Sequence, residues 1–184
     1  MEMTADPSPD PVAAPFQAPL GAGSLAANIL AQSALLIAAL ARASGDGAMA
    51  AQAERIAVRA GVLSVANDAA FSAATLELAA TARGEGDGFG LEFALGEAAA
   101  TPRVICEAAC DLALLSAQLA DTGDGSRRAD YIAVAQLSAA AASSAALLVR
   151  TNLTIGVDDW CLNAASAAAA EAARAAQRAA ALDF

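Results

Sequence analysis

The sequence predicts an all-α protein, a multihelical up-and-down array of long and short helices. Three observations support this prediction. No stretch alternates apolar and polar residues over a convincing length, so strands are not expected. Apolar and small residues recur at helical spacing along the chain. Glycine-rich breaks then divide the chain into segments of helical length.

The first half of the chain is predicted to form two long helices. One runs from Leu25 to about Arg42 and ends at the break 44–47. The other runs from about Ala48 to Arg83 and ends in the glycine-rich loop 84–88. The second helix has small or apolar residues at the spacing of a buried stripe, namely Ile56, Ala60, Leu63, Ala70 and Ala74.

Four further helices are predicted in the second half. A short one covers Leu91–Ala98. Thr101 and Pro102 form a start signal, a cap followed by proline at the first helical position, for a helix that continues to Asp121. After the turn at 123–125, a helix rich in alanine and serine begins at about 127–129 and ends at about 149–150. The last helix covers about 158–182.

The chain is expected to hold one domain. Residues 1–19, dominated by Pro, Asp and Ala, are predicted to be a flexible tail, and residues 20–184 a single helical domain. The tail lacks the basic segment and apolar core of a signal peptide. The longest apolar run, 25–41, contains Asn28, Gln32 and Ser33, which indicates a buried helix and not a membrane span.

Charge and composition exclude several kinds of chemistry. The formal net charge is −10, so nucleic acid and anionic membrane surfaces are not expected partners. All ten basic residues are arginine, because the sequence contains neither lysine nor histidine. Histidine triads, histidine metal sites, Schiff-base lysines and P-loop lysines are therefore excluded. Asp, Glu, Tyr131 and the cysteines remain for proton transfer, and neither a metal nor a cofactor is expected.

The three cysteines are predicted to be buried packing residues. Cys106 and Cys110 are one helical turn apart, too far for a C-x-x-C redox pair. An odd number of thiols fits a reducing compartment, and we expect a cytoplasmic protein. Because the abundant alanines bury little area each, covering one face with a second subunit would add stability, and a homodimer is expected.

The segment 19–24, Pro-Leu-Gly-Ala-Gly-Ser, leads directly into the first predicted helix. Gly21 and Gly23 keep side chains away from the backbone, and Ser24 is expected to cap the turn that follows it. Such an N-terminus, with free N–H groups and the positive end of the helix dipole, suits a carboxylate, phosphate or polarised carbonyl. The alternative is a tight turn with an ordinary cap.

Two acidic residues stand out from those expected in loops and on polar faces. Asp68 lies in mid-helix with Ser64, Phe71 and Ser72 among its neighbours and no arginine one turn away. Asp130 begins the alanine- and serine-rich helix. A carboxylate in such surroundings is a candidate general base. The alternatives are a hydrogen bond that Asp68 accepts from a nearby hydroxyl, and a favourable helix-dipole position for Asp130.

These pieces, in this order, resemble the cyclodeaminase/cyclohydrolase family of folate enzymes, which includes methenyltetrahydrofolate cyclohydrolase and formimidoyltetrahydrofolate cyclodeaminase. The resemblance spans about 19–159. The family's Pro-Gly-Gly-Gly-Ser loop is matched by 20–24, its mid-chain Asp and Ala-Phe pair by 68–71, and its small-residue-Pro element by 99–102. Its Ser-Asp-x-x-x-Ala element is matched by 129–135, and its closing Asn-Val-x-x-Asn by 148–152.

The resemblance implies an all-helical dimer that uses a tetrahydrofolate derivative as substrate. It implies hydrolysis of 5,10-methenyltetrahydrofolate to 10-formyltetrahydrofolate, or ammonia release from 5-formimidoyltetrahydrofolate. The expected catalytic residues are Asp68 and Asp130. The expected substrate-binding residues are Gly21, Ala22, Gly23, Ser24, Arg127, Arg128 and Asn152.

Several departures from the family pattern leave two alternatives open. The loop has Leu20 in place of proline and Ala22 in place of a glycine, and Leu148 replaces the first asparagine of the closing motif. The segment after the first helix, 43–47, lacks the family's lysines, which would bind the carboxylates of a polyglutamate tail. The alternatives are a catalytically degenerate helical dimer with a structural or regulatory role, and a ligand-binding bundle without turnover.

Overall fold

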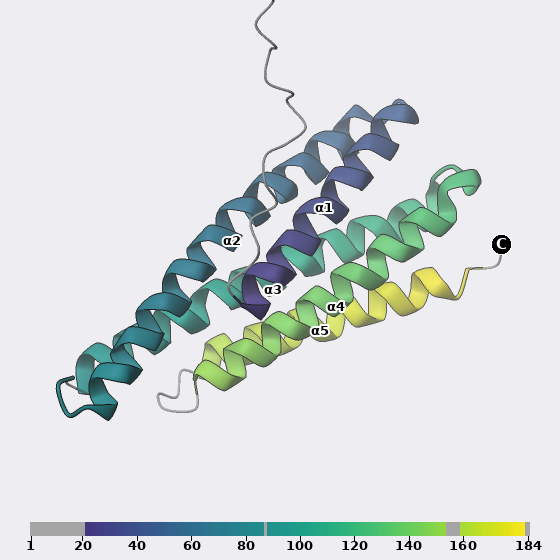
Figure 1. Ribbon diagram of the computed structural model, residues 1–184. Coiled ribbons are helices and arrows are strands. Elements are labelled where there is room, and N and C mark those ends of the chain that lie inside the picture. The colour runs from purple at the N-terminus through teal and green to yellow at the C-terminus, as the bar shows by residue number, and fades with distance from the viewer. Residues whose placement is uncertain (1–20, 87, 154–158, 183–184) are drawn as a thin grey trace, which may run out of the picture.

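The computed structural model describes residues 21–86, 88–153 and 159–182, and the described residues confirm the all-α prediction (Figure 1). The helices run up and down alongside one another. A single 3-10 turn, η1, precedes the fourth α-helix in these ranges. In chain order the elements are α1 (Ala22–Ala43), α2 (Gly47–Ala82), α3 (Gly88–Thr122), η1 (Gly125–Arg127), α4 (Arg128–Asn152) and α5 (Asp159–Ala180). The predicted tail, residues 1–19, lies outside the described residues.

The main hydrophobic core draws side chains from all five α-helices. α1 packs on α2 and α4, while α3 packs on α2, α4 and α5. Most core residues are alanine, so the helices lie close together around a few larger side chains such as Leu30, Ile37, Leu112 and Tyr131. Tyr131, one of the groups considered for proton transfer, is only 1% exposed.

Pro102 does not start a helix, contrary to the prediction from Thr101 and Pro102. It is buried inside α3, so the two helices predicted over 91–98 and 101–121 are one continuous element. A proline in mid-helix lacks the N–H that would bond the carbonyl four residues earlier. That carbonyl belongs to Ala98, and it accepts a hydrogen bond of 2.7 Å from the Asn152 side-chain amide. Asn152, the last residue of α4, thereby compensates the helix for the bond that Pro102 cannot make.

The turns explain where the other helices begin and end. Asp46 caps α2 by accepting a 3.0 Å hydrogen bond from the backbone N–H of Met49. Gly45 before it has a φ of +77°, a conformation that favours glycine. The predicted bounds of α2 therefore agree with the structure to about one residue. α1, in contrast, begins three residues earlier than predicted, at Ala22.

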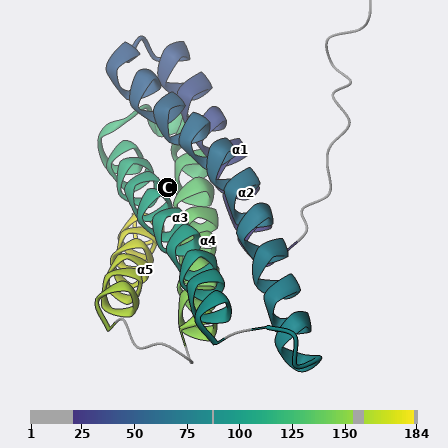
Figure 2. The ribbon, with the colours of Figure 1, turned by 90° about the vertical axis from the view of Figure 1, so that its left-hand side faces the viewer.

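The distal part of the α2–α3 hairpin is packed less well than the core. α2 has 36 residues against 22 in α1, and it continues alongside α3 past the start of α1 (Figures 1 and 2). Here a small separate cluster of Ala74, Ala94 and Ala98 joins the two helices. Large apolar side chains in the same region are exposed, namely Phe71, Leu76, Leu78, Phe89 and Phe93.

Two segments are apolar and long enough to span a membrane by length and composition alone, Ala22–Ala43 and Gly125–Asn152. In this structure 56% of the first window and 50% of the second are buried against the other helices. Both segments contribute to the main core, Leu30 and Ile37 from the first and Val134 and Val149 from the second. They are therefore core helices of the bundle.

Candidate functional site

The start of α1 holds four of the predicted site residues, Gly21, Ala22, Gly23 and Ser24. Gly21, in an extended conformation with φ −159° and ψ 178°, is the N-cap, and Ser24 is the third residue of the helix. The predicted capping by Ser24 is thus reversed in direction, because its hydroxyl oxygen accepts from the Gly21 backbone N–H before it, at 3.4 Å. The N–H groups at the beginning of a helix lack acceptors within it, so this end retains the positive pole expected of it.

Ser24 is completely buried and connects α1 to α2 through Asp68. Its hydroxyl donates to Oδ1 of the Asp68 carboxylate, and the Gly21 carbonyl oxygen lies 3.1 Å from the same hydroxyl. Asp68 itself is half-buried. Within the described part of the chain, its second oxygen, Oδ2, has no hydrogen-bond partner. The arrangement fits the hydroxyl partner foreseen for Asp68, and it also leaves one carboxylate oxygen able to accept a proton.

Two neighbours of Asp68 on α2, Asn67 and Ser64, complete the contact, and neither is among the predicted site residues. Asn67 is buried, and a Cβ on Gly23 would lie only 2.6 Å from its Cγ and 2.7 Å from its Nδ2. A side chain at position 23 would therefore require the Asn67 amide to move. Ser64 is also buried and donates to the Ser24 carbonyl oxygen at 3.4 Å. Asparagine is a poor helix former, so its presence in mid-helix directly before the predicted acid is the sequence signal that could have identified Asn67.

Within one chain, Asp130 does not lie near the contact between Ser24 and Asp68. It is half-buried in the first turn of α4, where the helix dipole favours a carboxylate. The first turn of α4 lies at the end of the bundle where α1 finishes, whereas the Ser24 contact lies where α1 begins (Figures 1 and 2). α1 is 22 residues long, which corresponds to about 33 Å. The two predicted catalytic acids therefore lie in different parts of the fold.

The three remaining predicted substrate-binding residues lie in α4 and the turn before it. The Arg128 Nε donates to the Ala120 carbonyl oxygen at 3.1 Å, close to the end of α3. Arg127 is exposed in η1. Asn152 bonds the Ala98 carbonyl at the far end of α4. Arg128 and Asn152 thus have structural contacts, and a role for any of the three in binding a substrate stays a prediction.

A cavity of about 680 Å³ opens between α2, α3 and α5, and its lining includes none of the predicted site residues. Asp111, Asp121 and Arg178 are its charged side chains. Partial burial raises the pKa of Asp111 above its usual value, with Glu107 adding to the rise and Arg59 opposing it.

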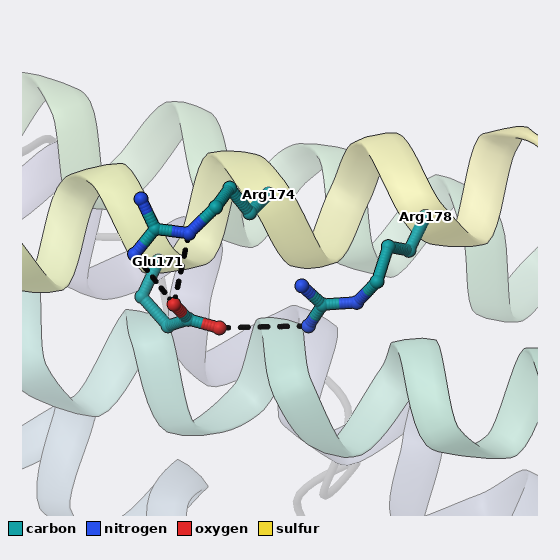
Figure 3. Close-up of polar contacts among 3 residues, drawn as sticks. All are labelled: Glu171, Arg174 and Arg178. Carbon is teal, nitrogen blue, oxygen red and sulfur yellow. Dashed lines mark hydrogen bonds and ion pairs between the residues drawn. The ribbon is translucent and has the colours of Figure 1, made fainter.

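Arg178 also pairs with Glu171 at 3.5 Å (Figure 3). Glu171 bonds Arg174 at 2.6 Å, and these arginines lower the pKa of Glu171.

The cysteines are buried and free, as predicted. Burial, with smaller contributions from Cys110 and Glu107, raises the pKa of Cys106 to about 12. Its thiol lies 3.2 Å from the Ala165 carbonyl oxygen, to which it donates. These surroundings keep Cys106 protonated and unreactive. The described residues contain no cluster of three or more acidic or cysteine side chains that could hold a metal ion.

Comparison with solved structures finds an enzyme with the same fold. No protein-family model matches the sequence, and no curated protein matches it either. Among solved structures, the crystal structure of formiminotetrahydrofolate cyclodeaminase from Thermotoga maritima superposes with a TM-score of 0.79. The match covers 89% of this chain and 87% of that one, at 19% sequence identity. The two chains share a fold over nearly their whole lengths.

Proposed function

We propose that this protein is a cytoplasmic folate one-carbon enzyme. It would hydrolyse 5,10-methenyltetrahydrofolate to 10-formyltetrahydrofolate, or release ammonia from 5-formimidoyltetrahydrofolate. The observation that carries the proposal is the fold shared with a formiminotetrahydrofolate cyclodeaminase over 89% of the chain. The Gly21–Ser24 segment and Asp68, which resemble that family's motifs in sequence, are in contact in the structure, and this supports the proposal further.

Asp68 is the proposed general base for the hydrolysis. The methenyl group is part of an amidinium cation, so attack of water on its one-carbon centre neutralises a positive charge while the water loses a proton. A carboxylate both attracts the cation and accepts that proton. Ser24 holds Oδ1 of Asp68, which leaves Oδ2 for the water. The N–H groups at the start of α1 would bind a carbonyl or carboxylate oxygen of the folate.

The test follows the absorbance of methenyltetrahydrofolate with purified protein. Wild type should exceed the buffer-catalysed rate, and Asp68→Asn should lower the enzymatic rate by about 10²-fold or more. Glu92→Gln removes an exposed carboxylate from α3 and serves as the matched control. Asp130→Asn shows whether the second predicted acid takes part. A wild-type rate equal to that of buffer excludes the hydrolase.

The cyclodeaminase reaction needs its own measurement, because both reactions use the same kind of pocket. Ammonia release from 5-formimidoyltetrahydrofolate is followed with the same set of variants. Release by wild type and its loss in Asp68→Asn would identify a deaminase. Hydrolysis without ammonia release would identify a cyclohydrolase.

A second candidate function is a helical dimer without turnover, with a structural or regulatory role. The observation that favours it is that predicted site residues have structural contacts, Asp68 with Ser24 and Asn152 with the Ala98 carbonyl. The chain also lacks any lysine for a polyglutamate tail. Folate binding by calorimetry without absorbance decay would indicate a ligand-binding bundle, and neither binding nor decay would indicate the structural role.

A further inference from the structure

The cavity between α2, α3 and α5 continues into a smaller hollow of about 270 Å³ beside α2. Gln52 and Asp111 line both spaces, so the two form one groove, with α3 lying between α2 and α5 (Figure 2). We call it the arginine groove and define it by its charged side chains, Arg55, Arg59, Asp111, Asp121 and Arg178. The larger part, about 680 Å³, has the volume of a small-molecule site.

Two arginines in the groove have no carboxylate bound to them. Arg55 and Arg59 are four residues apart on α2, so their side chains lie on consecutive turns of the same face. Neither side chain forms an ion pair or a hydrogen bond with another residue that the structure describes. Five other arginines pair with a glutamate, namely Arg42, Arg83, Arg103, Arg174 and Arg178. Two adjacent guanidinium groups without such a partner can together bind one external anion.

The larger part of the groove suits an apolar body with no second negative charge. Leu114, Leu115 and Leu182 line it. Asp111 and Asp121 also line it, and their carboxylates would repel a second anionic group. Three arginines against two aspartates nevertheless leave the groove with a positive excess, in a chain whose net charge is −10.

We propose that the arginine groove binds a small amphipathic molecule that has one carboxylate or sulfonate group on an aromatic or aliphatic body. The anionic group binds Arg55 and Arg59, and the body lies against Leu114 and Leu115. Asp111 and Asp121 are ten residues apart on α3, so the groove accepts a body of up to about 15 Å.

This site is separate from the Ser24–Asp68 contact. Asp68 comes 13 residues after Arg55 on α2, which places it about 20 Å away along the helix axis. None of the residues that line the groove belongs to that contact. The proposal is therefore independent of the proposed enzymatic activity.

The first experiment is a fluorescence titration of the full chain with 8-anilinonaphthalene-1-sulfonate, which has one sulfonate on an aromatic body. Wild type should bind the probe saturably, and Arg55→Gln/Arg59→Gln should raise the Kd by about tenfold or more. The matched control is Arg83→Gln/Arg150→Gln, which removes the same charge from exposed arginines outside the groove. Circular dichroism and urea denaturation check that the variants are folded. Absence of saturable binding, or equal weakening by the control, would overturn the proposal.

The second experiment uses the opposite sign of charge in the same groove. The Asp111 carboxylate lies close enough to Arg59 to interact with it electrostatically, and it would repel the bound sulfonate. Asp111→Asn should therefore lower the Kd of the probe by about twofold or more. A purely structural role of Asp111 would not tighten binding. Weaker or unchanged binding by Asp111→Asn would contradict the proposed anion site.

The third experiment tests the class of ligand and the place of binding. Displacement of the probe is compared for 4-phenylbutyrate and 4-phenylbutylamine, which have the same body with opposite charges. The carboxylate should displace the probe at a lower concentration than the amine. Asp68→Asn should bind the probe as wild type does, because Asp68 lies outside the groove. Stronger displacement by the amine, or loss of probe binding in Asp68→Asn, would overturn the proposal.

Discussion

At the scale of single residues, the Ser24 hydroxyl is the contact that connects α1 to the predicted acid. It is buried, and it donates to a carboxylate that has no other described partner for its side chain. Ser24→Ala would leave Asp68 Oδ1 without its donor, and we expect a loss of about 1–3 kcal/mol in the free energy of unfolding. Urea denaturation measures it, with the exposed Ser72→Ala as control. Equal midpoints for the two variants would contradict this account.

Asp111 provides a pH-dependent test at the same scale. Its pKa is raised above the usual 3.8, chiefly by partial burial, so the folded state disfavours its charged form. The stability associated with its protonated form is present below pH 3.8 and is lost as the pH rises through the folded-state pKa. Asp111→Asn should therefore raise the melting temperature at neutral pH but not below pH 3.8. A variant less stable than wild type at neutral pH would contradict the sign.

The residues around the site show the limit of sequence reasoning. Asp68 and the glycine–serine segment stand out in the sequence, and the structure places them in contact. Asn67 and Ser64 do not stand out, because their importance comes from close packing against Gly23 and Ser24, which lie 40 or more positions earlier. The separation of Asp130 from this cluster also depends on which helices are neighbours, and no local pattern specifies that.

At the scale of helices, Pro102 and Asn152 behave as a pair. Asn152→Ala should leave the Ala98 carbonyl without the side-chain donor, and we expect it to lower the free energy of unfolding by about 1–3 kcal/mol. In a Pro102→Ala background the helix regains its own N–H donor for that carbonyl, so the cost of Asn152→Ala should shrink. Chemical denaturation of the four proteins in this double-mutant cycle gives the coupling free energy between Pro102 and Asn152. Equal costs of Asn152→Ala in both backgrounds would exclude an energetic coupling between the two residues.

The same pair explains which helix bounds the sequence could predict. The bounds predicted for α2, α4 and α5 agree with the structure to within a few residues. The predicted start at Pro102 was wrong because the donor that lets α3 continue lies on another helix. This donor, the Asn152 amide, comes 54 positions after the Ala98 carbonyl that it bonds. The helix-start signal depends on adjacent residues, whereas the contact that overrides it here comes from a residue distant in the chain.

At the scale of the whole molecule, stability should be uneven. The main core joins all five helices, whereas the distal hairpin of α2 and α3 is joined by a cluster of only three buried alanines. Hydrogen exchange should therefore be faster in segments 71–82 and 88–97 than in 105–120 or 131–149. Mass spectrometry of peptides from exchanged protein measures this. Uniform protection along α2 and α3 would show that the hairpin is held as firmly as the core.

Trp160 supplies a built-in reporter for the last helix. It is the sole tryptophan of the chain, it lies near the start of α5, and the Arg103 guanidinium of α3 stacks 4.8 Å from its ring centre. An indole against a cation on a neighbouring helix is sensitive to their separation. Its emission spectrum would therefore register detachment of α5 from α3 in a titration or a stopped-flow trace, without any attached dye.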